Sequence, residues 1–309
     1  MYFIIFFVYI LLMCFIGKTY FRESSSSKAL MIILISLLVN LSVLWAVHSD
    51  FVLNSYEFFY PDESFFYGAA DILSHQKSLS SIWNMAVVEA QFGNGTRMGC
   101  FIMGTIGYFF NNSELLQRTF LLLCSSSIPL LVFKLGLRYV NAKSAFFCSV
   151  LFALFSYVNS YSCWIFRDIY VMFFSTLLLV LVTGKFSIYR LFFIFSIFII
   201  LFLLRPVSGV IVIPLLLYYI FNKRVLLSKR ILVVRYISLI VLLFLSPIML
   251  TSFVSSLNVS NDYVDRTLNF QEQSGMAMWA YSLPIGIRNI VTALYSQITP
   301  IPFSLLKQK

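Results

Sequence analysis

Two adjacent acids open the first stretch of this chain that could carry out chemistry. Asp62 and Glu63 follow Pro61, and Tyr67 and Asp71 come one and two helical turns later. A proline at the first position and acids in the first turn favour the start of an ordinary helix. The aromatic residues around the motif allow a second interpretation, because a carboxylate in a water-poor setting holds its proton more tightly or binds a cation. Either property suits a general base or a metal–phosphate site.

A second charged pair, Arg167 and Asp168, lies between two long apolar runs. Charges in such a position are costly unless they face water or protein. An ion pair at a helix end would account for them. Alternatively, Asp168 could meet Asp62 or Glu63 on one face of the protein, with Arg167 available to bind a phosphate.

A third candidate is Arg205, which precedes Pro206 between two strongly apolar runs. A long basic side chain that reaches toward lipid headgroups would explain it. An arginine near two acidic sites could equally bind a phosphate or pyrophosphate. The two histidines, His48 and His75, have no metal-ligand spacing, and the sequence has no glycine-rich phosphate loop or nucleophile elbow.

The amino-acid composition indicates the environment that surrounds these candidate residues. The 309 residues are 60% hydrophobic and 11% charged, whereas soluble domains typically carry about 25% charged residues. The net charge of +10 comes from basic residues in short clusters between apolar runs. That arrangement is typical of the cytoplasmic loops of membrane proteins, so we do not expect nucleic acid as a partner.

Apolar runs long enough to cross a bilayer predict about eight transmembrane helices. They lie at residues 2–17, 29–47, 118–135, 144–163, 169–184, 189–204, 207–222 and 231–252. A ninth run, 98–110, is shorter than the ~20 residues that a span needs. Four basic connectors lie at residues 18–28, 134–143, 185–190 and 223–235. They share one side of the membrane only if the run 98–110 does not cross, so we expect a re-entrant or interfacial helix there.

The predicted fold class is therefore all-α, a multi-pass protein of the plasma membrane with its acids on the outer face. Four parts are expected: an N-terminal helix hairpin, an outer loop with the acidic motif, a transmembrane core and an outer C-terminal segment. They cover residues 1–49, 50–117, 118–252 and 253–309. Cys100 and Cys163 both fall near the outer boundary, which leaves a disulfide open, although buried free thiols are the simpler expectation.

The order of these features resembles the GT-C class of membrane glycosyltransferases. That class has an acidic Asp-Glu-x-x-x-Tyr type motif in its first outer loop, which Asp62, Glu63 and Tyr67 match. Interfacial helices follow and lead into a span, as the chain does before Arg118. A basic cytoplasmic hairpin and a second acid come next, and Asp168 matches that acid. The likeness covers about residues 50–225.

The resemblance implies a glycosyltransferase of bacterial surface-polysaccharide assembly, of the O-antigen or capsule type. Its donor would be a sugar linked to undecaprenyl phosphate, and its acceptor a glycan or lipid-linked glycan, both reached on the periplasmic face of the inner membrane. Asp62 or Glu63 would be the base or metal ligand, and Asp168 the second acid. The cofactor stays open, with a divalent cation (Mg²⁺ or Mn²⁺) on Asp62 and Asp168 as one option.

Four residues are the expected substrate contacts under this resemblance: Tyr67, Arg118, Arg167 and Arg205. Two helices precede the acidic motif where one is usual, and no soluble C-terminal domain follows. Both features also resemble the O-antigen polymerases (Wzy type), which join lipid-linked repeat units on the same face.

A flippase or transporter of lipid-linked sugars is a third hypothesis. Transporters usually show inverted repeats and charges near the middle of the membrane, whereas the acids here are assigned to the outer face. A structural membrane subunit, with its charges as interface anchors, is the remaining alternative.

Overall fold

The computed structural model describes residues 2–21, 23–48, 61–93, 96–155, 158–184 and 187–221. Within these ranges every regular element is a helix, which confirms the all-α prediction for this part of the chain. The chain divides into two units, residues 1–249 and 250–309. The second unit and the predicted span at 231–252 lie outside the described residues.

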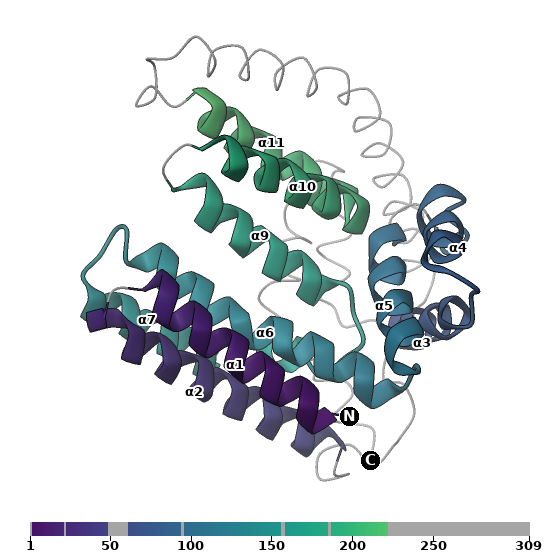
Figure 1. Ribbon diagram of the computed structural model, residues 1–309, viewed down its shortest axis with the longest axis horizontal. Coiled ribbons are helices and arrows are strands. Elements are labelled where there is room, and N and C mark those ends of the chain that lie inside the picture. The colour runs from purple at the N-terminus through teal and green to yellow at the C-terminus, as the bar shows by residue number, and fades with distance from the viewer. Residues whose placement is uncertain are drawn as a thin grey trace, which may run out of the picture. The chain divides into compact units, whose positions relative to one another are not determined.

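Four helices form one bundle: α1 (Tyr2–Tyr20), α2 (Glu23–His48), α6 (Glu114–Gly136) and α7 (Ala142–Phe155). They lie side by side in Figure 1, with α2 in contact with both α6 and α7. These helices are apolar on most of their surface, as expected for helices in lipid or in a large core. At one end of the bundle the rings of Phe21 and Phe133 stack, with their centroids 5.5 Å apart.

Polar side chains cross the interior of this bundle. The Asn40 side-chain oxygen accepts hydrogen bonds from Ser125 Oγ at 3.0 Å and from Ser162 Oγ at 2.7 Å. The Asn40 amide nitrogen in turn donates to the backbone oxygen of Ser36 at 2.8 Å. In an apolar surrounding such bonds hold helices together, because a polar group without a partner is costly. The network joins α2 and α6 to the segment that follows α8 (Val158–Tyr161).

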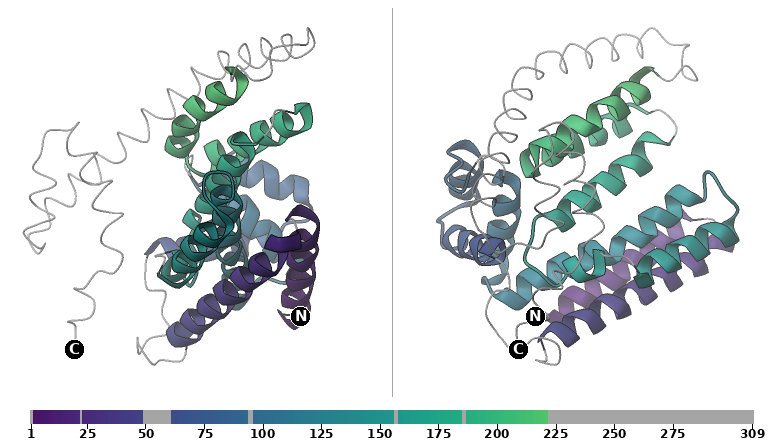
Figure 2. Two further views of the ribbon diagram at one scale, coloured as in Figure 1. Left: turned by 90° about the vertical axis from the view of Figure 1, so that its left-hand side faces the viewer. Right: turned by 180° about the vertical axis from the view of Figure 1, so that it is seen from behind.

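A second group consists of α9 (Asp168–Val182), α10 (Ile188–Leu204) and α11 (Pro206–Phe221). Helix α9 lies between α6 and the pair α10–α11 in the views of Figures 1 and 2. Pro206 occupies the first position of α11, where a proline loses no helical hydrogen bond. Leu178, Phe198 and Leu216 are buried at the centre of this group.

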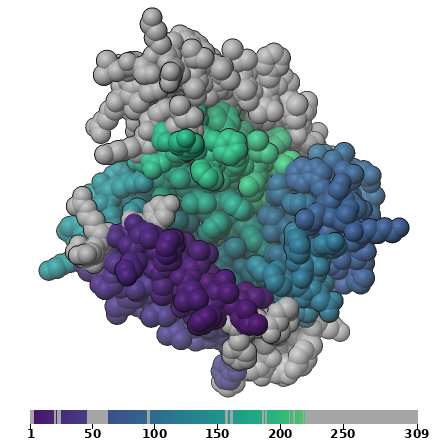
Figure 3. All heavy atoms as spheres, in the orientation of Figure 1, coloured from purple at the N-terminus to yellow at the C-terminus, as the bar shows by residue number. Residues whose placement is uncertain are grey.

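A third group gathers where α6 begins. It contains α3 (Pro61–Ser74), α4 (Leu79–Trp83), a short π-helix (Asn84–Val88) and α5 (Arg97–Phe110). Figure 3 shows this group beside the helices α9–α11 on the face in view, and α5 contacts α10. Helices α3 and α5 approach closely because Gly104 has no side chain: a Cβ there would lie 2.5 Å from the Cβ of Leu73.

Seven of the eight apolar runs predicted as spans fall on described helices, but the number of membrane crossings stays a prediction. By length and composition, two of them could cross a membrane, Ser25–Trp45 and Glu114–Gly136. The others are shorter, and the run predicted at 144–163 is divided between α7 and α8. The apolar run at 98–110 forms α5, whose 14 residues are too few for a span, and its re-entrant or interfacial position stays a prediction.

The close packing of α3 on α5 makes a testable prediction. Gly104→Ala is expected to lower the free energy of unfolding by about 1–3 kcal/mol, because its new methyl group would overlap Leu73. Gly68→Ala on α3 is the matched control, since nothing lies within 4 Å of its new Cβ. The control should be neutral or stabilising by up to about 1 kcal/mol. Thermal unfolding of the purified variants measures both, and equal midpoints would contradict the packing.

Candidate active site

Glu63 of the acidic motif is fully buried in the first turn of α3. Its Oε1 atom lies 2.7 Å from Arg118 Nη2 and accepts a hydrogen bond of 3.1 Å from the Ile165 backbone N–H. A buried carboxylate is tolerated only when it is paired and hydrogen-bonded. Both conditions are met here, so Glu63 is held in a defined place as an ion.

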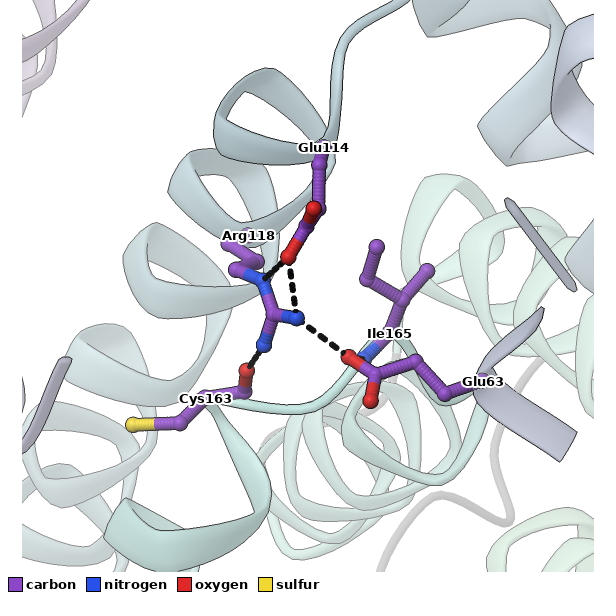
Figure 4. A network of polar contacts seen from close by, with 5 residues as sticks. All are labelled: Glu63, Glu114, Arg118, Cys163 and Ile165. Carbon is purple, nitrogen blue, oxygen red and sulfur yellow. Dashed lines mark hydrogen bonds and ion pairs between the residues drawn. The ribbon is translucent and has the colours of Figure 1, made fainter. Parts of the chain in front are cut away.

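Arg118 lies near the start of α6 and is only 4% exposed. Its Nε and Nη2 atoms lie 2.9 and 2.5 Å from Glu114 Oε1, and its Nη1 donates to the Cys163 backbone oxygen. Figure 4 shows the guanidinium group at the centre of these contacts, between the two acids and the backbone. The helix begins here because Ser113 Oγ caps it, accepting from the Leu116 N–H at 3.3 Å. Glu114 in its first turn suits the helix dipole.

Together these contacts fix the connector between α8 and α9. Glu63 binds the N–H of Ile165 and Arg118 binds the carbonyl of Cys163, so two backbone groups of the connector are held by side chains from α3 and α6. Three residues after Ile165 the chain reaches Asp168, in the first turn of α9. The acidic motif and the segment of the second acid, 102 residues apart at this contact, therefore meet in the fold.

Asp168 forms an ion pair with Arg205. Asp168 Oδ1 lies 2.9 Å from Arg205 Nη1, and the two side chains are 32% and 52% exposed. Arg205 lies between α10 and α11 and has an extended backbone conformation, so its side chain is not confined within a helix. An ion pair this exposed contributes about 0–1 kcal/mol. A phosphate could therefore take over the Arg205 contact at small cost.

Arg167 and Tyr67 lie in the same region. The Arg167 guanidinium carbon is 5.8 Å from the centroid of the Phe66 ring, a cation–π arrangement. Gly99 of α5 makes room for Arg167, because a Cβ there would lie 3.0 Å from the Arg167 Cβ. Partial burial raises the pKa of Tyr67, and so do the negative charges of Asp71 and Glu114. Its hydroxyl thus stays protonated at neutral pH and can donate a hydrogen bond.

Asp62 lies in the first turn of α3, but its side chain is outside the described residues. Among the side chains that are described, no three His, Cys, Asp or Glu residues gather as metal ligands. A cation held by Asp62 and Asp168 thus stays a prediction. Cys100 and Cys163 are both free thiols and both buried.

The sequence did not single out Glu114, although its spacing of four residues from Arg118 is a recognisable helical pair. Arg118, expected as a substrate contact, contacts Glu63, Glu114 and the connector, and its substrate role stays a prediction. The sequence singles out Arg167 in the connector but gives no sign of the contacts at Cys163 and Ile165, because these involve backbone atoms. Comparison with protein families, curated proteins and solved structures finds no match to the chain.

Burial distinguishes the two acids that contact Arg118. Arg118→Met would leave the Glu63 carboxylate buried without a cation, which is expected to cost about 3–5 kcal/mol of unfolding free energy. Glu114→Gln is the matched control, because the Glu114 side chain is 36% exposed and such pairs contribute about 1 kcal/mol or less.

Denaturant unfolding of the purified variants measures the difference. The double variant Glu63→Gln/Arg118→Met should recover part of the loss, because the uncompensated charge is then gone. If Arg118→Met cost no more than Glu114→Gln, the buried pair would not be the main contact of this region.

Proposed function

We propose that this chain is a membrane glycosyltransferase that transfers sugar from a polyprenyl-phosphate-linked donor to a glycan or lipid-linked acceptor. The observation that supports this most is the hydrogen bond from the Ile165 N–H to Glu63 Oε1. Through this contact the acidic motif lies against the connector that leads to Asp168. These are the two acidic segments that the resemblance to GT-C enzymes requires in one site.

The membrane setting is part of the proposal. Two described helices are long and apolar enough to span, and several others expose large apolar side chains. Phe155 of α7 is 80% exposed, Phe192 of α10 is 71% exposed and Phe7 of α1 is 61% exposed. A water-soluble protein rarely presents so many apolar groups, whereas a lipid-facing surface requires them. We place the site on the periplasmic face of the inner membrane, because eleven of the twelve acids lie outside the four basic connectors that the charge distribution assigns to the cytoplasm.

Each residue has a proposed role in the reaction. An acceptor hydroxyl oxygen attacks the anomeric carbon of the donor, and the bond from that carbon to the phosphate oxygen breaks. The polyprenyl phosphate leaves with the electron pair, and the hydroxyl proton passes to a carboxylate, Asp62 or Asp168. Arg205 binds the donor phosphate. Glu63 is a positioning residue in this scheme, since its carboxylate is already bound to Arg118 and Ile165.

The glycan profile of a strain without the gene tests the proposal. Loss of a single sugar from the surface polysaccharide would support the transferase. Surface chains that stop after one repeat unit would instead identify a polymerase of lipid-linked units. An unchanged profile would contradict both and leave a transporter or structural subunit.

The acids make a sharper prediction within the same assay. Asp62→Asn and Asp168→Asn keep the shape of the side chain but remove the proton acceptor, and loss of a general base typically costs about 10²–10⁴-fold in rate. We expect whichever variant removes the base to abolish sugar transfer in a complemented strain while the protein accumulates normally.

Asp71→Asn is the control for this pair. Asp71 lies on the same helix as Asp62, but it is exposed and its carboxylate accepts only a 3.3 Å hydrogen bond from Asn112 among the contacts of the described residues. It should restore near-normal transfer. Full transfer by both Asp62→Asn and Asp168→Asn would end the enzyme proposal.

A further inference from the structure

Two arginines from different connectors meet at the C-terminal end of α9. Arg138 follows α6, and Arg190 lies in the first turn of α10. A Cβ added to Gly184, just after α9, would overlap Nη1 of Arg190 and lie 3.3 Å from Nη2 of Arg138. Both guanidinium groups therefore lie against the same glycine, whose missing side chain leaves space for them.

The C-terminal end of α9 attracts positive charge, but two guanidinium groups placed there also repel each other. Its last carbonyl groups carry partial negative charge, which favours one nearby positive charge. Arg138 also donates to Thr183 Oγ1. A second guanidinium at the same place is repelled by the first: burial and the charge of Arg190 lower the pKa of Arg138. Lys134, one turn earlier on α6, adds another positive charge and stacks over the Phe21 ring at 4.7 Å.

Exposed aromatic residues flank the two arginines. Tyr139 is 70% exposed, and Tyr189 and Phe192 are 82% and 71% exposed. Tyrosine and phenylalanine beside basic residues are typical of the boundary between lipid headgroups and acyl chains. A soluble anion would need the arginines alone, whereas a lipid would use both the arginines and the rings.

We propose that Arg138 and Arg190 form a binding site for the phosphate of an anionic membrane lipid. Two guanidinium groups can each donate paired hydrogen bonds to phosphate oxygens, and a bound anion removes their mutual repulsion. The basic connectors lie on the face that the charge distribution assigns to the cytoplasm, where anionic lipids attract such residues. Helix α6 separates this site from Arg118 by on the order of 25–30 Å, so it is distinct from the candidate active site.

The test titrates phosphatidylglycerol into the full-length protein in neutral detergent and follows the midpoint of thermal unfolding. Phosphatidylglycerol should raise the midpoint, and phosphatidylcholine, which has no net charge, should raise it much less. Arg138→Gln and Arg190→Gln should each weaken the apparent affinity roughly fivefold, the effect of about 1 kcal/mol per basic residue near an anionic surface.

Two further variants separate a built site from general attraction. Lys143→Gln removes one charge from an exposed position in the first turn of α7, five residues after Arg138, and should bind phosphatidylglycerol like the unaltered protein. Gly184→Ala changes no charge but displaces Arg190, and should weaken binding. Equal losses for Lys143→Gln and Arg190→Gln would overturn the proposal, as would equal stabilisation by phosphatidylcholine. The same stabilisation by inorganic phosphate at equal concentration would also overturn it, in favour of a soluble anion.

Discussion

The buried ion pair between Glu63 and Arg118 is the contact on which the rest of this region depends. Neither side chain has access to water, since Glu63 is 0% and Arg118 4% exposed. Two charges in such a place are tolerated only if each finds its full set of partners. Those partners come from three separate elements, α3, α6 and the connector before α9. The need to satisfy the charges therefore fixes how these elements meet.

The buried Glu63–Arg118 pair contrasts with the exposed Asp168–Arg205 pair. Asp168 and Arg205 share one contact of 2.9 Å at a partly exposed position, so a substrate group can replace either partner at small cost. Glu63 and Arg118 cannot separate in the same way, because each would be left buried and charged. The buried pair therefore holds the elements together. Under the proposed function, the exposed pair would be the one that contacts the substrate.

The sequence predicts the helices of this chain better than it predicts their contacts. Apolar runs locate α1, α2, α6, α9, α10 and α11 to within a few residues, because each helix must hide or shield its apolar surface. Pro206 begins a helix, as proline at a first helical position suggests. The Glu114–Arg118 contact is also local, because residues four apart are neighbours on one helix.

The long-range contacts could not be predicted in this way. From the sequence alone, Asp62 and Glu63 are equivalent candidates for the base or metal ligand. Only the burial of Glu63 against Arg118 indicates that Glu63 has a positioning role. Arg118 is expected as a substrate contact only through the resemblance to GT-C enzymes, and nothing in the sequence indicates its contact with Glu63, which lies 55 residues earlier. The bonds of Asn40 to Ser125 and Ser162 are equally non-local. The hydropathy pattern indicates whether a residue prefers water or an apolar environment, but it does not indicate which residue it contacts.

Hydrogen exchange at the connector is the most direct test of this account. In the native protein the Ile165 amide donates to Glu63 Oε1, so its exchange should be slow although it lies outside a helix. In Glu63→Ala, the amide should exchange at least about tenfold faster, the effect of losing a hydrogen bond to a charged group. Amides of α10 should keep their rates and show that the fold persists. Unchanged exchange at Ile165 would contradict the claim that Glu63 binds the connector to the acidic motif.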